Sequence, residues 1–230
     1  MIPDLGYYIP YSTLARPAHS FLGSVLICLP AGLALWGIFH LLRKPLCFIL
    51  PQPHRRALTP LAATPFSWHA RSLIAAGVSV LLGAWTHIIW DSFTHNTWLV
   101  EYLLLREPVF RVSTVEFPWY SLLQHVSTAV GAGILISAYC SWLRLNRGWA
   151  TAPSIEPEDR WRYLLLVAVA ALALVVAAPH AVQAAARFEG YRALRVLLFR
   201  MIVDTTAAFF ALLSLFSLIL YAVRRGQAAA

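Results

Sequence analysis

The sequence is poor in charge. Only 12% of its 230 residues are Asp, Glu, Lys or Arg, whereas 60% are hydrophobic. So few charged side chains cannot cover the surface of a water-soluble globule of this size, which argues against a soluble enzyme or binding module. The mean hydropathy of +0.66 agrees with that conclusion. The composition therefore predicts an integral membrane protein.

Cysteine is scarce and lysine nearly absent. The three cysteines (Cys28, Cys47 and Cys140) are odd in number and lack CxxC spacing, which argues against a disulfide framework and a zinc ribbon. The 17 arginines and one lysine outnumber the ten acidic residues. These basic residues lie between apolar runs instead of forming one block with aromatic residues. That pattern is typical of basic residues that set the orientation of a membrane protein, and it argues against a nucleic-acid partner. Residues 1–17 also lack a basic stretch followed by an apolar one, so no signal peptide is expected.

Apolar runs of about 20 residues, the length that crosses the hydrocarbon core, recur along the chain. They cover residues 19–42, 72–91, 120–143, 163–180 and 201–223. We therefore expect an all-α fold, a polytopic membrane bundle of about five transmembrane helices in a single domain, residues 1–230. Residues 45–71 are expected to be an interfacial connector and residues 94–120 a partly helical lid or surface loop. Ser154, with acidic residues after it, is a candidate start for the fourth helix.

The basic residues predict the orientation. If alternate loops share a side of the membrane, one side carries eleven of the 18 basic residues: Arg43, Lys44, Arg55, Arg56, Arg71, Arg144, Arg147, Arg160, Arg162, Arg224 and Arg225. By the positive-inside rule this side is cytoplasmic. We expect an external amino terminus and a cytoplasmic carboxyl terminus, although four arginines between residues 187 and 200 oppose the trend.

A stripe of polar residues ends the second apolar run. His87, Asp91 and His95 follow one another at intervals of four, which places them on nearly the same side of a helix. Polar groups at the end of a membrane helix cost free energy unless water, a partner or a metal satisfies them. The spacing therefore indicates a functional site.

The predicted topology gathers histidines at one boundary. Five of the eight lie on the external side: His19, His87, His95, His125 and His180. We expect a metal site whose ligands are His19, His87, Asp91, His95 and His125. Asp4 is close enough in sequence to fold over it, so that Asp91 or Asp4 serves as ligand or as catalytic general base. Imidazole and carboxylate suit zinc or another divalent first-row ion, and three protein ligands with one open position would be catalytic.

A purely structural interpretation of the histidines is the alternative to a metal site. Each histidine can be an interfacial residue hydrogen-bonded to a neighbouring helix or to a lipid headgroup. For His180 we prefer this structural interpretation. For the group with HxxxDxxxH spacing we favour the metal site.

Several short elements, taken in order, resemble a known family. They are Pro3-Asp4 with Tyr7-Tyr8, Ala18-His19-Ser20, Thr86-His87 through Asp91 to Thr94-His95, and Leu122-Leu123-Gln124-His125. Together they resemble a bacterial integral-membrane family of unknown function, which looks related to inner-membrane proteins regarded as metal-dependent hydrolases. The resemblance covers residues 1–141, and the helices within 163–223 carry no motif. It implies a polytopic protein of the bacterial inner membrane with a metal centre.

One departure from that family concerns the amino terminus. Its members usually begin with an extra segment that carries a histidine before the Pro-Asp element, whereas this chain starts at that element. We expect either a misassigned start codon or one missing ligand.

The function expected from these features is that of a membrane-embedded metal-dependent hydrolase, acting at the external face on a lipid-linked or envelope ester or phosphoester. Its expected partners are membrane lipids and a lipid-linked substrate. A transporter or channel that relays protons or passes an ion through the same cluster is an alternative. A structural membrane protein whose histidines only hold helices together is another. The position of the polar cluster along the membrane normal distinguishes an enzyme from a transporter. A transporter needs polar residues near the midplane, whereas an enzyme needs a site at one boundary that is open to one side.

Overall fold

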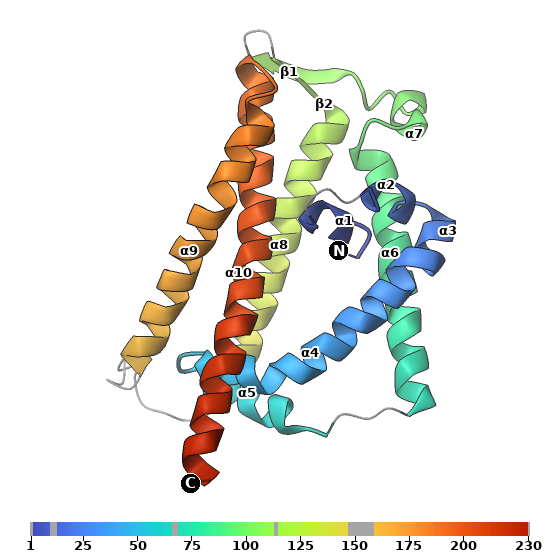
Figure 1. The fold of residues 1–230 in the computed structure, drawn as a ribbon. Helices are drawn as coiled ribbons and strands as arrows, with labels where there is room; N and C mark the ends of the chain where they lie inside the picture. The colour runs from blue at the N-terminus through green and yellow to red at the C-terminus, as the bar shows by residue number, and fades with distance from the viewer. Residues whose placement is uncertain (1, 10–12, 66–68, 113–114, 147–158, 230) are drawn as a thin grey trace. The chain divides into compact units, whose positions relative to one another are not determined.

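The computed structural model describes residues 2–9, 13–65, 69–112, 115–146 and 159–229. Within these ranges, five helical segments are long and apolar enough to cross a membrane (Figure 1): Phe21–Ile49, Ala70–Thr94, Trp119–Asn146, Arg160–Ala185 and Gly190–Gln227. The expectation of an all-α polytopic membrane bundle with about five spans is thereby confirmed. The helix start expected at Ser154 lies outside the described residues.

The helices are longer than the apolar runs that predicted them. Helix α6 covers Ala70–Thr94, against an expected 72–91, and α10 covers Gly190–Ala229, against an expected 201–223. An apolar run measures the hydrocarbon thickness, whereas helical hydrogen bonding continues into the headgroup region. The predicted start of a connector at residue 45 is wrong, because α4 (Leu29–Ile49) runs through Pro45 and the connector contains α5 (His54–Ala63).

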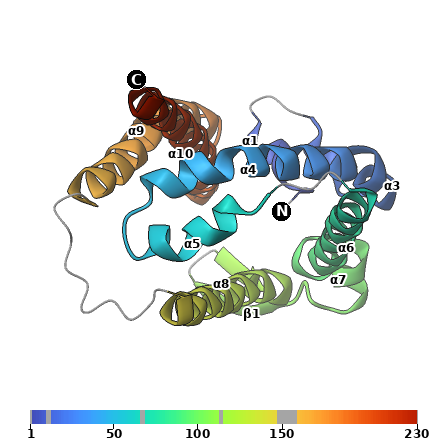
Figure 2. The ribbon, with the colours of Figure 1, turned by 90° about the horizontal axis from the view of Figure 1, so that it is seen from below.

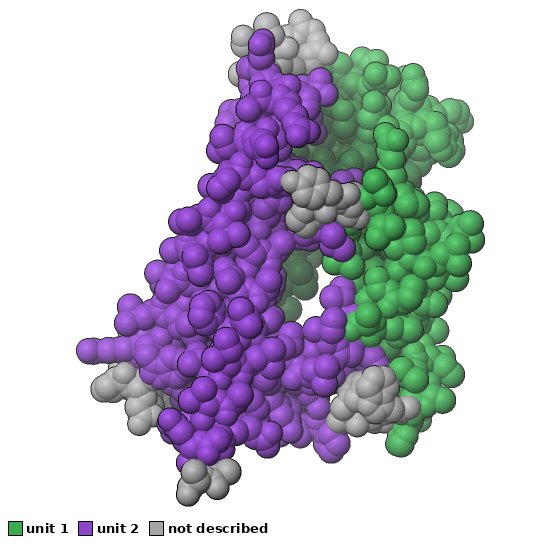
Figure 3. All heavy atoms as spheres, in the orientation of Figure 1, with its two compact units in different colours: residues 1–6, 13–34, 68–145 green, residues 7–12, 35–67, 146–230 purple. Residues whose placement is uncertain are grey.

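The chain divides into two units, coloured separately in Figure 3. Unit 1 comprises residues 1–6, 13–34 and 68–145, and unit 2 comprises residues 7–12, 35–67 and 146–230. Every candidate metal or catalytic residue expected from the sequence belongs to unit 1.

Unit 1 begins with short helices and ends with two long ones joined by a small hairpin. Its elements are the start of α1 (Leu5–Tyr8), α2 (Ala15–Ala18), α3 (Phe21–Gly23), the π-helical turn η1 (Ser24–Cys28), the start of α4, α6, α7 (Trp98–Tyr102), β1 (Pro108–Val112), β2 (Val115–Pro118) and α8 (Trp119–Asn146). The strands pair antiparallel, with Phe110 opposite Phe117. Segment 94–120 is thus partly helical, as expected, but it also forms a two-stranded sheet.

Two tryptophan indoles fasten α6 to its neighbours. The Trp85 indole nitrogen donates to the Ser24 hydroxyl of η1 at 2.7 Å, and that of Trp90 donates to the Ser127 hydroxyl of α8 at 3.2 Å. Lower down, α4 and α6 approach so closely that a Cβ at Gly32 would come within 2.7 Å of a side-chain carbon on α6. The carboxyl-terminal half of α6 is therefore held on two sides.

In unit 2, helices α9 (Arg160–Ala185) and α10 lie side by side in both views (Figures 1 and 2). Small buried residues recur on α9 at intervals of four, namely Ala173, Ala177 and Ala181. Small side chains let two membrane helices approach closely, and packing replaces the hydrophobic effect there. Repeated alanines on α9 thus account for the pairing.

Asp159 organises the start of α9. Its buried carboxylate accepts hydrogen bonds from the backbone N–H of Gln52 and from Arg162 Nη1, both at 2.9 Å, and lies 3.4 Å from Arg55 Nη2. Arg162 in turn donates through Nε to the Phe48 carbonyl at 3.2 Å. This network joins the end of α4, the start of α5 and the start of α9 within unit 2.

Candidate metal centre

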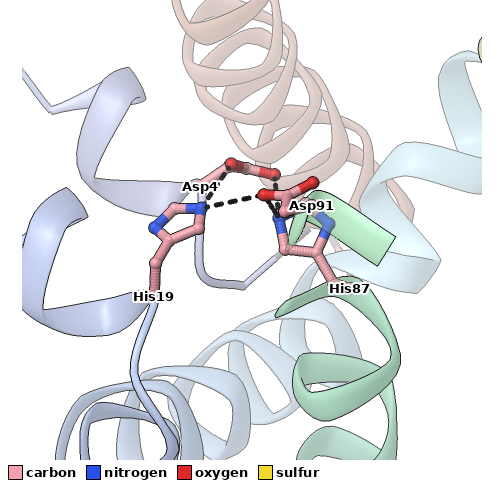
Figure 4. Close-up of side chains that lie close together, drawn as sticks. All are labelled: Asp4, His19, His87 and Asp91. Atoms are coloured by element: carbon pink, nitrogen blue, oxygen red, sulfur yellow. Dashed lines mark hydrogen bonds and ion pairs between the residues drawn. The ribbon is translucent and has the colours of Figure 1, made fainter. Parts of the chain in front are cut away.

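Unit 1 brings four potential ligands together: Asp4, His19, His87 and Asp91 (Figure 4). Asp4 precedes α1, His19 follows α2, and the other two lie near the carboxyl-terminal end of α6. One ligand atom from each lies within 4.8 Å of those of the other three. His19 Nε2 is 3.2 Å from Asp4 Oδ1 and 3.5 Å from Asp91 Oδ2. His87 Nε2 is 3.1 Å from Asp4 Oδ2 and 3.2 Å from Asp91 Oδ2.

The backbone around His19 sets the direction of its ring. Its Nδ1 lies 2.6 Å from the Ala15 carbonyl, so Nδ1 carries the hydrogen and Nε2 faces the carboxylates. The chain turns tightly after α2, because the Ser20 hydroxyl donates to the Pro17 carbonyl at 2.8 Å and accepts from the Gly23 amide at 2.9 Å. A Cβ at Gly23 would lie only 1.8 Å from the Pro17 carbonyl oxygen. A larger residue there would open the turn that presents His19.

Asp4 reaches the group because the first helix packs backbone against backbone on the second. A Cβ at Gly6 would come within 2.5 Å of the Ala15 nitrogen, so glycine permits the approach. Burial by itself would raise the pKa of Asp4, but the hydrogen bond and charge of His87, together with the charges of the amino terminus and His19, outweigh it and hold the pKa below the ordinary value of 3.8. Asp4 is therefore a carboxylate at neutral pH, as a ligand or a general base must be.

His87 and Asp91 face the group from successive turns of α6. Among the residues that the structure describes, the buried His87 Nε2 has no hydrogen-bond partner of good geometry, although two carboxylate oxygens flank it at ion-pair distance. A buried polar atom without a proper hydrogen bond is costly. A cation shared between this nitrogen and the carboxylates would satisfy all of them.

The geometry and the donor set fit a divalent ion. Ligands about 2.1 Å from a tetrahedral metal lie about 3.4 Å from one another, and the four His–Asp separations run from 3.1 to 3.5 Å. Two adjacent carboxylates repel unless a cation or a proton lies between them. Two imidazole nitrogens with two carboxylates are a set that zinc and its first-row neighbours accept. The four side chains are 12 to 27% exposed, so the group is only partly buried.

The other two predicted ligands lie differently. His95 follows the last residue of α6, half-exposed, with Nδ1 3.6 Å from Asp91 Oδ1 and Nε2 3.3 Å from the Gln124 amide nitrogen. His125, on α8, is exposed, and its Nδ1 donates to the carbonyl of Ser121 in its own helix at 2.6 Å. Of these two expected ligands, His95 therefore lies at the edge of the group and His125 lies outside it. The reason is that α8 directs Gln124, and not His125, toward this end of α6.

His180 belongs to unit 2, and it bonds to a neighbouring helix, as the structural interpretation expects. In unit 2 its Nδ1 pairs with Asp204 Oδ2 at 2.7 Å.

Sequence reasoning missed the residues that orient the ligands. Trp85 was not a candidate site residue, but its indole joins α6 to η1 half a turn before His87. Gln124 contacts His95, although only its histidine neighbour was a candidate. Neither role had a signal in the sequence, since a π-helical turn and a helix rotation appear only in three dimensions.

Comparison with known proteins identifies a family but no activity. A family model described as "Domain of unknown function (DUF4184)" matches residues 1–222. No curated protein and no solved structure matches the chain.

Proposed function

We propose that the chain, which belongs to the DUF4184 family of unknown function, is a membrane-embedded metal-dependent hydrolase. Its substrate in this proposal is a lipid-linked or envelope-located ester or phosphoester, reached from the external face of a bacterial inner membrane. The observation that carries the proposal is the group of two histidines and two aspartates, whose four His–Asp separations fit a tetrahedral metal centre.

The place of the group along the spans favours an enzyme over a transporter. Asp4 and His19 precede the first span, which begins at Phe21, and His87 and Asp91 lie within the last two turns of the second. At a rise of about 1.5 Å per residue, His87 is about 10 Å from the end of its helix. A site near one boundary suits reaction with a substrate from one side, whereas an ion path needs polar groups at the midplane.

The donor set suggests a division of roles. His19, His87 and Asp91 would hold the ion, because three protein ligands with one open position are typical of catalytic zinc. Asp91 Oδ2 is shared between the two imidazoles, and its Oδ1 faces His95. Asp4, on a segment before the first span, would then be the general base.

The reaction in this proposal is an ordinary hydrolysis. A divalent ion held by His19, His87 and Asp91 would supply Lewis acidity and would make a water molecule more acidic near neutral pH. The water oxygen bonds to the acyl carbon or the phosphorus, and the bond to the leaving oxygen breaks. Asp4 takes the proton of the water and returns it to the leaving oxygen, so that an alcohol and an acid are released.

Purified protein tests the proposal. We expect about one zinc or other first-row ion per chain, together with turnover of a chromogenic aryl ester or aryl phosphodiester that a chelator removes and the metal restores. Asp4→Asn should retain the metal and lose turnover, whereas Asp91→Asn should lose both. Stoichiometric metal without turnover of either substrate would refute the hydrolase, and equal effects of the two substitutions on metal content would refute the division of roles.

A further inference from the structure

An apolar patch lies on the segment between α6 and α8, outside the membrane spans. Trp98 and Tyr102 of α7 are 76 and 78% exposed, and Leu104 is 69% exposed. These three side chains are called the α7 patch below. Large apolar side chains exposed together usually mark a contact surface.

Local structure holds the α7 patch outward. Trp98 and Tyr102 are four residues apart and share one face of α7, while Val100 on the opposite face is fully buried. Leu104 has a φ of +56°, a left-handed conformation that is rare for a residue other than glycine. The Leu105 amide donates to the Val100 carbonyl at 2.9 Å and closes that turn. A strained residue that displays a leucine suggests a functional contact.

The α7 patch is tied to the metal centre. The Thr97 hydroxyl, just before α7, donates to the Ser92 carbonyl at 2.6 Å, and Ser92 follows Asp91 in the chain. Figure 1 shows α7 directly beyond the end of α6 that carries the centre. Whatever covers the α7 patch therefore lies beside the candidate site.

The exposed surface at this end of unit 1 points to lipid as the cover. Ile89 and Trp90 near the end of α6, and Trp119 at the start of α8, are exposed as well, so both spans that flank the α7 segment also expose large apolar side chains where they adjoin it. Tryptophan and tyrosine prefer the depth where headgroups meet acyl chains. The exposed polar side chains Glu101 and Arg106 pair at 3.7 Å, so they add no net charge there.

We propose that the α7 patch docks into the headgroup–acyl boundary of the bilayer that α6 and α8 cross, and that the metal centre acts on an ester or phosphoester carried by a lipid of that bilayer. The first part stands by itself, and the second rests on the proposed hydrolase function. A lipid at this boundary holds its ester and phosphoester groups at headgroup depth, near the end of α6. The substrate then arrives laterally instead of from water.

The depth of the α7 patch is measured without any activity. A nitrobenzoxadiazole label is placed at Leu104→Cys, in a chain with Cys140→Ser because the other two cysteines are buried. The protein is reconstituted in phosphatidylcholine–phosphatidylglycerol vesicles. A label at Glu107→Cys, an exposed polar position of the same segment, is the control.

We expect spin-labelled lipid to quench the label at position 104 and aqueous iodide to quench the label at position 107. Iodide quenching of both would overturn the docking. A label at 104 that neither agent reaches would also overturn it, because a second copy of the chain or another part of the protein would then cover the patch.

Substrate class is tested by kinetics on the metal-loaded protein. Trp98→Glu and Leu104→Glu should lower turnover of a chromogenic lipid ester in vesicles by about tenfold and leave a water-soluble aryl ester within about twofold, since only docking is changed. Leu145→Glu, 85% exposed at the other end of α8, is the matched control and should change neither rate. Equal loss on both esters, or loss on neither, would overturn the lipid substrate.

The two proposals fail in distinguishable ways. A wild-type protein that turns over only the soluble ester overturns the lipid substrate and keeps the hydrolase. A wild-type protein that turns over neither ester overturns the hydrolase and the substrate with it, while the labels still decide the docking.

Discussion

Removing one ligand from the candidate metal centre should weaken metal binding severely without unfolding the protein. Structural zinc sites with four protein ligands contribute about 10–16 kcal/mol, so each ligand there is worth about 3 kcal/mol, or about two orders of magnitude in Kd, and we take the same value for each of the three ligands proposed here. His87→Ala and Asp91→Ala should each show a loss of that size. The helix should remain in place, because Trp85 and Trp90 hold α6 by contacts that neither substitution touches.

The assay combines metal content with stability. Metal per chain is measured on protein purified in detergent, Kd by competition with a chromophoric chelator, and thermal unfolding on the same samples without metal. His125→Ala is the matched control, since it removes the same kind of side chain from a histidine that bonds within its own helix and lies outside the group. It should keep the affinity of the wild type.

One result would refute this reasoning. If the wild type binds no transition metal, and His87→Ala or Asp91→Ala lowers only the unfolding temperature, the four side chains form a hydrogen-bonded joint between α6 and the amino-terminal segment. A structural protein would then explain the group better than an enzyme or a transporter.

Three further predictions concern orientation, pH and unit 2. Reporter fusions after Arg225 and within residues 94–120 should lie on opposite sides of the membrane, and a common location would disprove the predicted topology. Folding lowers the pKa of Asp4, so its ionised form stabilises the folded state above the ordinary pKa of 3.8 and this contribution is lost as the pH falls through the lowered value. The difference in unfolding temperature between metal-free wild type and Asp4→Asn should therefore shrink in acid; a constant difference would contradict it. Asp159→Ala should lower the free energy of unfolding by about 3–5 kcal/mol, because it leaves the buried Arg162 without its counter-ion. Denaturant unfolding measures that loss, and an unchanged metal affinity would show that it stays within unit 2.

Several features of the protein follow from the sequence because they depend on composition and local spacing. The apolar runs identify the spans, since their length is set by the thickness of the hydrocarbon core. The interval of four between His87 and Asp91 places both on one side of α6, since helix geometry is the same in every protein. Even Pro3-Asp4 and His19 could be named as candidates, because they precede the first span on the side where α6 ends.

Tertiary structure decided which candidates meet. His19 points to the carboxylates because the Ala15 carbonyl holds its Nδ1, and Asp4 reaches it because Gly6 allows backbone contact. His125 stays outside the group because the rotation of α8 directs Gln124 to His95. Helix rotation and the path of an irregular segment depend on packing between residues far apart in the chain, which local periodicity does not encode. The sequence by itself thus determined the spans and a set of polar residues at one boundary, and packing decided which four of these residues lie together.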